Sequence, residues 1–272
     1  MEKRNIMLWD THMHCHFSGD SEATPRAMIE SAIRKGLSGI CFTDHLDLDY
    51  REEPGYFDLD FENYQKEIIA LKEEYTNRFS VLWGIELGLQ PHVAVENSKV
   101  IKTYPFDFVI GSSHLVDHID IYYPAFYEGR TERSACRRYF ESVLENIATD
   151  VNFDVYGHLD YIVRYLPTKN QTFSYTKYSD LIDEILRKLI EKGKGIEMNM
   201  AGFKYGLGHP NPTEDILKRY KELGGEIITI GSDAHKPDQI AWDYHKVPKL
   251  LKEAGFEYYT VFKQRKAEFI KL

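Results

Sequence analysis

Short apolar runs rich in β-branched residues alternate along this chain with longer segments whose apolar residues recur at helical spacing. The segment near 60–77 is of the second kind, because Ile68, Leu71 and Tyr75 follow one another at intervals of three and four residues. The strand-length runs cover residues 6–14, 38–45, 80–89, 106–114, 153–161, 195–200 and 226–235. This alternation predicts repeated βα units and a parallel sheet.

Local signals indicate where the intervening helices begin and end. Thr24 followed by Pro25 is typical of a helix N-terminus, and Gly36 is expected to end that helix. The remaining helices are expected near 60–77, shortly after His92, near 131–149 and 177–192, from Asn211 to Gly224, and over about 239–254, with a last strand over 258–263. Seven βα units without a linker favour a closed, seven-stranded TIM-like barrel over a doubly wound sheet.

Composition narrows this picture further. A chain of 272 residues admits one large α/β barrel or two domains, and the absence of a composition shift favours a single domain over residues 1–272. No apolar run is long enough to span a bilayer and the N-terminus lacks the apolar stretch of a signal peptide, so we expect a cytoplasmic protein that binds no membrane. The net charge of −9 predicts that nucleic acid is repelled.

The three cysteines, Cys15, Cys41 and Cys136, are an odd number at unpatterned spacing. This spacing argues against a disulfide framework and against a cysteine-based zinc site. Any metal chemistry is therefore expected to rest on imidazoles and carboxylates.

Residues that can bind metals gather at the C-terminal ends of the predicted strands, where parallel α/β folds place their active sites. These candidate ligands are six histidines, two aspartates and one glutamate: His12, His14, Asp20, His45, Glu86, His114, His158, Asp233 and His235. One ion rarely takes more than six ligands, so nine predict two or three metals. Imidazole with carboxylate suits zinc, manganese or iron.

The spacing of these residues also has a geometric meaning. In a strand, residues i and i+2 point to the same face, so His12 and His14 can hold one ion together, and Asp233 and His235 can contact two neighbouring ions. A lone histidine at a strand end is more often a packing or hydrogen-bonding residue than a ligand. Six of them accompanied by acids favour metal binding instead. His92 is expected at the surface.

The same residues carry a resemblance to a known family. HMHCHFSGD, FTDH, GIELG, GSSH, YGHLDY and GSDAH resemble the ordered motifs of the PHP (polymerase and histidinol phosphatase) family, from the first predicted strand to the seventh. GHLDYIVRY, IEMNMAGF, HPNPTEDIL and GSDAHKP are similar to its monofunctional histidinol-phosphate phosphatases. The resemblance implies a distorted (β/α)7 barrel and hydrolysis of L-histidinol phosphate in histidine biosynthesis.

The resemblance also implies a site for three divalent ions of zinc, iron or manganese. Its ligand sets would be His12, His14, Glu86 and Asp233 for the first ion, Glu86, His114 and His158 for the second, and Asp20, His45 and His235 for the third. Position 20 departs from the family, since many members have a histidine there. Aspartate is a competent hard ligand, although it can favour iron or manganese.

Chemistry at such a site is expected to be hydrolysis of a small phosphate monoester by in-line attack of a metal-bridging hydroxide. Glu86 and Asp233 would hold the ions for this step, and Arg164 would clamp the phosphate as a catalytic and substrate-binding residue. His16 and Ser18 are placed near the phosphate or the ligands. Asn199 is expected to contact the substrate or the metal ligands, and Asp44 to orient His45 or a water. The aromatic loop over 122–139 is expected to form a lid or a wall of the pocket.

Three other functions remain open at this point. A phosphatase of the same family acting on phosphotyrosine or a nucleotide would need the same metals and a different pocket. A nuclease is disfavoured by the acidic charge. A non-catalytic barrel is disfavoured by the complete ligand set. The sequence does not choose the metal, the proton donor to the leaving group or the oligomeric state.

Overall fold

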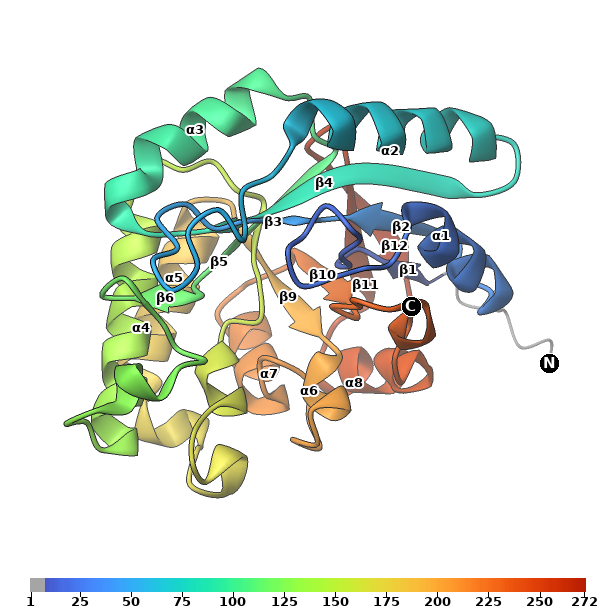
Figure 1. Ribbon diagram of the computed structural model, residues 1–272. Helices are drawn as coiled ribbons and strands as arrows, with labels where there is room; N and C mark the ends of the chain where they lie inside the picture. Colours follow the sequence, from blue (N-terminus) through green and yellow to red (C-terminus); the bar gives the residue numbers. More distant parts are fainter. Residues whose placement is uncertain (1–7) are drawn as a thin grey trace.

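The computed structural model describes residues 8–272, and its centre is a parallel sheet rolled into a barrel with helices around it (Figure 1). Seven strands pair in parallel in the order β1-β2-β4-β5-β8-β9-β10. Their bounds are β1 (Trp9–Asp10), β2 (Gly39–Phe42), β4 (Ser80–Gly88), β5 (Phe108–Ser112), β8 (Val155–Tyr156), β9 (Gly195–Asn199) and β10 (Ile228–Gly231). A further strand, β3 (His45–Leu46), continues beside β4.

The first and last strands close the barrel through backbone hydrogen bonds just beyond β1. The amide of Thr11 donates to the carbonyl of Ile230 at 2.9 Å, and the amide of His14 donates to Ala234 at 2.8 Å. These bonds complete a barrel of seven parallel strands. The TIM-like architecture predicted from the sequence is therefore confirmed.

Helices surround the strands on the outside of the barrel (Figure 1). Their bounds are α1 (Pro25–Arg34), α2 (Phe61–Tyr75), α3 (Ala94–Thr103), α4 (Glu132–Ala148), α5 (Ser179–Glu191), α6 (Ala201–Lys204), α7 (Glu214–Glu222) and α8 (Val247–Glu253). Short 3-10 turns lie between them: η1 (Pro91–Val93), η2 (Pro124–Tyr127), η3 (Tyr161–Arg164), η4 (Lys169–Gln171), η5 (Tyr175–Lys177), η6 (Pro237–Gln239) and η7 (Tyr244–Lys246). None of the helices in residues 8–272 has the length and apolar character needed to cross a membrane.

Helix α1 begins and ends as its sequence predicts. The Thr24 side chain accepts a hydrogen bond from the amide of Ala27 at 3.3 Å, which satisfies one of the free donors at the helix start. Gly36 follows the helix with φ +76°, a left-handed conformation that glycine adopts without steric cost.

Most strands are shorter than the apolar runs that predict them. The run over 6–14 gives only Trp9–Asp10 within the described residues, and positions 6 and 7 lie outside them. The reason is that strand pairing stops where the polar residues begin. After Asp10 the chain contacts β10 through single hydrogen bonds and an isolated bridge at Met13.

The helix expected over about 239–254 is wrong in its first half. Residues 237–246 form two 3-10 turns, and α8 begins only at Val247. Asp243 has φ +54°, which a helix interior does not allow, and Pro248 lacks the amide hydrogen that an interior helical residue donates.

Two antiparallel hairpins complete the fold. The strand expected over 258–263 is present as β11 (Tyr258–Lys263), and it pairs with β12 (Lys266–Lys271), which the sequence analysis missed. Phe262 of this hairpin stacks on Phe108 at 5.3 Å between ring centroids. The second hairpin joins β6 (Leu115–Val116) to β7 (Ile119–Asp120).

Candidate metal centre

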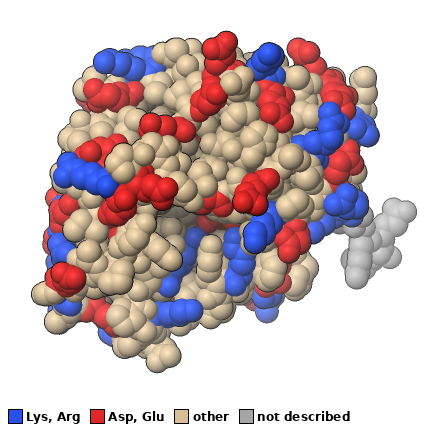
Figure 2. Space-filling view, viewed as in Figure 1, with Lys and Arg blue, Asp and Glu red and all other residues tan. Residues whose placement is uncertain are grey.

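A recess opens at the C-terminal ends of the barrel strands, near the middle of the face shown in Figure 2. Its walls combine imidazoles, carboxylates, three tyrosines and one arginine: Asp20, His45, His114, His158, Tyr161, Arg164, Tyr165, Tyr205, Asp233, His235 and Gln239. Six of the nine predicted ligands line this recess, and the other three, His12, His14 and Glu86, contact residues that line it. This is the end of the barrel where enzymes of this architecture work.

Glu86 on β4 lies at the centre of the cluster and is fully buried. One of its oxygens, Oε2, is 3.1 Å from Nε2 of His12 and 3.5 Å from Nε2 of His14. Asp233 approaches the same two imidazoles, with Oδ1 at 3.5 Å from His14 and 3.9 Å from His12. Asp233 has φ +53°, a strained conformation for a residue other than glycine, and strain of this kind is characteristic of functional sites.

The other oxygen of Glu86, Oε1, faces a second group of imidazoles. It lies 2.9 Å from Nε2 of His158 and 3.3 Å from Nε2 of His114, and it accepts a hydrogen bond from the Ser112 hydroxyl at 2.7 Å. One carboxylate therefore offers its two oxygens to two different groups of histidines. That is the arrangement required of a bridging ligand.

A third group lies at the mouth of the recess. Oδ2 of Asp20 is 2.9 Å from Nε2 of His235 and 3.7 Å from Nε2 of His45. The rings of His45 and His235 both stack on the ring of His14, at 4.1 and 4.3 Å between centroids. Asp20 is thus close to both imidazoles.

The spacing of these side chains suits ligands of divalent ions better than hydrogen bonds between the side chains themselves. Nε2 of His12 and Nε2 of His14 face each other at 3.1 Å. Nδ1 of His45 lies 3.2 Å from Glu86 without a hydrogen-bond geometry, although it is buried. Ligands 2.0–2.1 Å from a tetrahedral zinc are about 3.3 Å apart, which is the spacing found here. We conclude that the cluster is built to hold divalent metal.

The pKa shifts within the cluster also indicate a binding site. Burial would lower the pKa of His12, but the carboxylates of Glu197 and Glu86 outweigh burial and raise that pKa well above its ordinary value. Burial and the neighbouring imidazoles of His45 and His235 lower the pKa of His14. Neighbouring groups of one kind are thus pushed to opposite protonation states, which is typical of a binding or catalytic site.

Two acids that the sequence analysis missed contact the Nδ1 atoms of His12 and His114, on the side of each ring away from Glu86. Oε1 of Glu197, on β9, is 2.7 Å from Nδ1 of His12, and Oδ1 of Asp47 is 2.7 Å from Nδ1 of His114. A carboxylate on the far nitrogen fixes the ring and directs Nε2 toward the metal. Both acids could have been found, since Glu197 stands two residues before Asn199 and Asp47 two residues after His45.

Asp44 does not orient His45 as the sequence analysis expected. Its carboxylate accepts hydrogen bonds from the Cys15 amide at 2.7 Å and from the Ser18 hydroxyl at 2.9 Å. Asp44 therefore stabilises the turn after His14, and Asp47 is the acid that approaches the His45 ring, at 3.5 Å.

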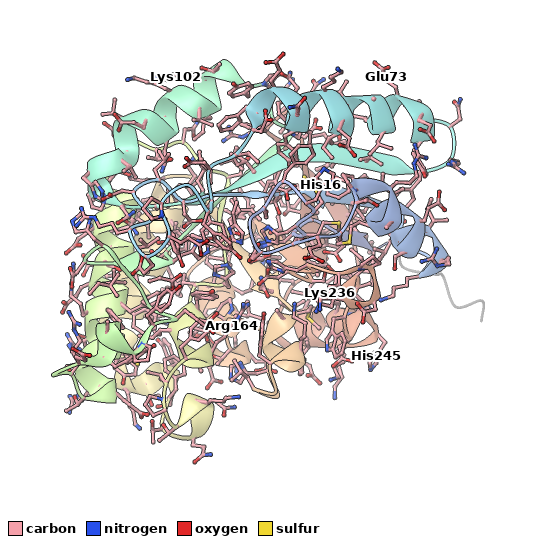
Figure 3. All side chains as sticks on the ribbon, viewed as in Figure 1. His16, Glu73, Lys102, Arg164, Lys236 and His245 are labelled. Carbon is pink, nitrogen blue, oxygen red and sulfur yellow. The ribbon has the colours of Figure 1, made fainter. Side chains whose placement is uncertain are left out.

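Arg164 lies in the recess with its guanidinium fixed in one orientation (Figure 3). It donates from Nε to Asn211, from Nη1 to Asp233 and from Nη2 to Asn199, each at 3.0 Å. The rings of Tyr161 and Tyr205 lie 4.8 and 4.9 Å from the guanidinium carbon. A guanidinium has five N–H donors, so two remain for an anion in the recess.

Of the residues expected at the substrate or beside the ligands, His16 lies outside the recess, whereas Ser18 and Asn199 contact the candidate ligands His14 and Asp233. His16 is away from Arg164 (Figure 3), and its ring is 3.5 Å from the carboxylate of Glu67 outside the recess. The Ser18 hydroxyl accepts from the His45 amide at 2.9 Å and is buried behind the ligands. Asn199 is also fully buried and contacts Arg164 instead of lining the recess.

The segment over 122–139 is not one loop. It contains η2, and from Glu132 it continues as α4, in which Tyr139 is completely buried. Tyr122 of this segment approaches the recess, with its ring 5.6 Å from that of Tyr165. Helical spacing and the capping side chain of Thr131 account for the difference.

Comparison with known proteins identifies a family and two relatives that the chain resembles. The model of the PHP domain family matches residues 10–201. A histidinol-phosphatase of Lactococcus lactis is 34% identical over 264 residues, which cover 95% of this chain and 96% of the relative. A histidinol-phosphatase of Bacillus subtilis is 25% identical and matches 90% of this chain and 97% of the relative.

The fold also has close structural counterparts. The crystal structure of histidinol phosphate phosphatase from Lactococcus lactis, complexed with zinc, L-histidinol and phosphate, has a TM-score of 0.89 and 34% identity, and covers 97% of this chain and 100% of its own. A Listeria monocytogenes structure with 19% identity has a TM-score of 0.77 over 88% of this chain and 99% of its own, which supports the fold alone.

Proposed function

Because the chain belongs to the PHP domain family, we propose that it is a divalent-metal phosphatase that hydrolyses L-histidinol phosphate to L-histidinol and phosphate in histidine biosynthesis. The observation that carries this proposal is a match along almost the whole chain to a protein crystallised with zinc, L-histidinol and phosphate. The cluster around Glu86, open to a recess that contains Arg164, supports the same activity.

We propose three ions, held by the three groups described above. His12, His14, Glu86 and Asp233 would hold the first, Glu86, His114 and His158 the second, and Asp20, His45 and His235 the third. One oxygen of Glu86 faces the first group and the other faces the second, which supports a carboxylate that bridges two ions. The proposed catalytic unit is the whole chain, because its ligands come from segments that follow both the first and the last strand of the barrel.

Bound divalent ions lower the pKa of a coordinated water and neutralise phosphate oxygens. Residues of the chain supply the rest of the mechanism. Arg164 would bind phosphate oxygens through its two remaining donors, while Asp233 and Asn199 keep its guanidinium in place. Tyr161 and Tyr165, which share a hydrogen bond of 2.8 Å between their hydroxyls, form the adjoining wall.

Phosphate release from L-histidinol phosphate by Glu86→Ala tests this function. Removing the shared carboxylate is expected to lower kcat/KM by more than about 100-fold, because loss of a mere supporting residue at a metal site already costs about 10- to 100-fold. Metal content, measured on the same samples, is expected to fall with activity. Glu73→Ala is the matched control, since Glu73 is exposed on α2 far from the recess (Figure 3).

Equal rates for wild type and Glu86→Ala would refute the metal mechanism. A substrate panel tests the specificity separately. If phosphotyrosine or a nucleotide monophosphate is hydrolysed far faster than L-histidinol phosphate, the metal chemistry stands and the substrate assignment is wrong.

A further inference from the structure

A second group of metal-binding side chains lies outside the recess. Asp49 comes from the loop after β3, His92 from η1 and His118 from the turn between β6 and β7. None of the three lines the recess of the metal centre. Three separate segments of the chain therefore place two imidazoles and a carboxylate together at the surface.

The ligand atoms of this group converge on one point. Oδ2 of Asp49 lies 2.9 Å from Nε2 of His92 and 3.2 Å from Nδ1 of His118. The centroids of the two imidazole rings are 4.5 Å apart. These spacings match both the separations around Glu86 and the value of about 3.3 Å expected between two ligands of one tetrahedral zinc.

The backbone brings these side chains together through conformations that are strained for residues other than glycine. Asp49 has φ +59° and His118 has φ +65°, so two of the three residues hold left-handed conformations that favour glycine. The three side chains remain accessible, with 34% of Asp49, 41% of His92 and 39% of His118 exposed. His92 and His118 also border a surface groove, through which solvent can reach the group.

We propose that Asp49, His92 and His118 form a separate surface site for one divalent transition metal of the zinc class. Two imidazoles and one carboxylate supply three protein ligands, and water completes the coordination. The ion fastens the loop after β3 to η1 and to the β6–β7 turn. This site is independent of the proposed phosphatase activity.

Arg51 sets the affinity of the site. Its Nε and Nη2 donate to the Asp49 carboxylate at distances from 2.8 to 3.2 Å. These hydrogen bonds keep the pKa of Asp49 below its usual value, so the carboxylate stays ionised and ready to ligate. The positive charge of the guanidinium also opposes a cation, and removal of Arg51 is expected to tighten metal binding.

The loop fastened by this ion also contacts histidines of the metal centre, although none of its residues lines the recess. Asp47, two residues before Asp49, bonds His114 at 2.7 Å. Further along the loop, the Phe57 ring packs against His45 at 5.0 Å between centroids. Binding at the surface is therefore expected to stabilise the loop that supports two histidines of the metal centre.

Zinc titration of the metal-loaded holoenzyme tests the proposal. After free metal is removed, wild type is expected to bind one additional zinc per chain in competition with a chromophoric chelator. His92→Ala and His118→Ala are expected to weaken that binding at least tenfold, and Arg51→Gln to strengthen it several-fold. His245→Ala, at an exposed histidine of η7, is the matched control and is expected to bind as wild type does.

All these variants change exposed side chains, so kcat/KM for L-histidinol phosphate is expected to stay within twofold of wild type. Two results would overturn the proposal. One is a wild type that takes up no zinc beyond its metal centre. The other is a His92→Ala/His118→Ala double variant that binds the additional zinc as tightly as wild type does.

Discussion

Two imidazoles of the metal centre are positioned by carboxylates outside the ligand sets. Glu197 bonds Nδ1 of His12, and its other oxygen accepts a hydrogen bond from the His158 amide at 3.0 Å. One buried acid thus positions histidines of two different ligand groups. We expect its effect on metal binding to exceed that of a surface carboxylate by a wide margin.

Glu197→Gln should show this effect. The change keeps the size of the side chain but removes the negative charge behind His12, and we expect metal affinity or kcat/KM to fall about 10- to 100-fold. Metal per chain by mass spectrometry and phosphate release would measure it. Glu191→Gln, on the exposed end of α5, is the control; a Glu197→Gln enzyme with wild-type metal content and rate would contradict the assignment.

Arg164→Lys separates binding of phosphate from binding of metal. Lysine keeps the positive charge but loses the planar fork that bonds Asp233, Asn199 and Asn211. We expect kcat/KM for L-histidinol phosphate to fall about 100-fold, mainly through KM, from the loss of roughly 2–3 kcal/mol of charge-assisted hydrogen bonding. Steady-state kinetics with metal content as the control would test it, and a change in kcat/KM below threefold would exclude the clamp.

For single residues, the sequence predicted the candidate metal ligands better than the residues that contact those ligands. The period of two in a strand, applied to His12 and His14, correctly brought both rings to one face. The same rule applied to Glu197 would have found the acid behind them. His16 was misplaced because residues after His14 form a turn, in which the alternation of a strand no longer holds.

Among the elements, α1 offers a clean test of helix capping. Thr24→Ala removes the side chain that accepts from the Ala27 amide, and we expect the free energy of unfolding to fall by about 1 kcal/mol. Urea denaturation would measure this, with activity unchanged under native conditions. Thr103→Ala, which removes a hydroxyl bonded to the Lys99 carbonyl at the end of α3, should change stability far less.

Elements with their own local signals were the ones predicted well. Amphipathic spacing and caps gave α1, α2, α4 and α5 to within a few residues. Strand ends were overestimated, because the residues after the last paired position are polar but still buried, so burial continues where strand pairing has stopped. The hairpin partner β12 was missed because its residues are largely exposed and lack an apolar face that sequence patterns can detect.

On the scale of the whole molecule, the β11–β12 hairpin is joined to the barrel by a partly buried ion pair. Arg265 donates from Nε to Asp154 at 2.5 Å, and its amide bonds the Asp107 carbonyl at 2.9 Å. Burial raises the pKa of Asp154, and the guanidinium opposes that rise.

Arg265→Ala would leave the Asp154 carboxylate buried without its partner. We expect the free energy of unfolding to fall by about 2–3 kcal/mol, toward the low end for a broken buried pair because the guanidinium is 22% exposed. Chemical denaturation would measure the loss. Arg187→Ala, at a more exposed ion pair on α5, is the control, and equal stabilities for the two variants would contradict the prediction.

Metal affinity of the whole cluster should depend on pH. In the metal-free protein, burial would lower the pKa of His45, but Glu86 and Asp20 raise it to about 9. Ligation requires the neutral imidazole, so an ion must displace the proton that His45 holds below that pH. We expect apparent affinity to fall about tenfold per pH unit per displaced proton as the pH drops from 9. Chelator competition would measure it; an affinity independent of pH would refute it.

The ligands come from opposite ends of the chain, and this order has a consequence during translation. His12 and His14 leave the ribosome first, whereas Asp233 and His235 are made only after all seven barrel strands. A nascent chain therefore carries several of the imidazoles long before it has the acid that completes the first ligand group. We therefore expect firm retention of metal only in a polypeptide synthesised past His235, and not in a fragment terminated before it.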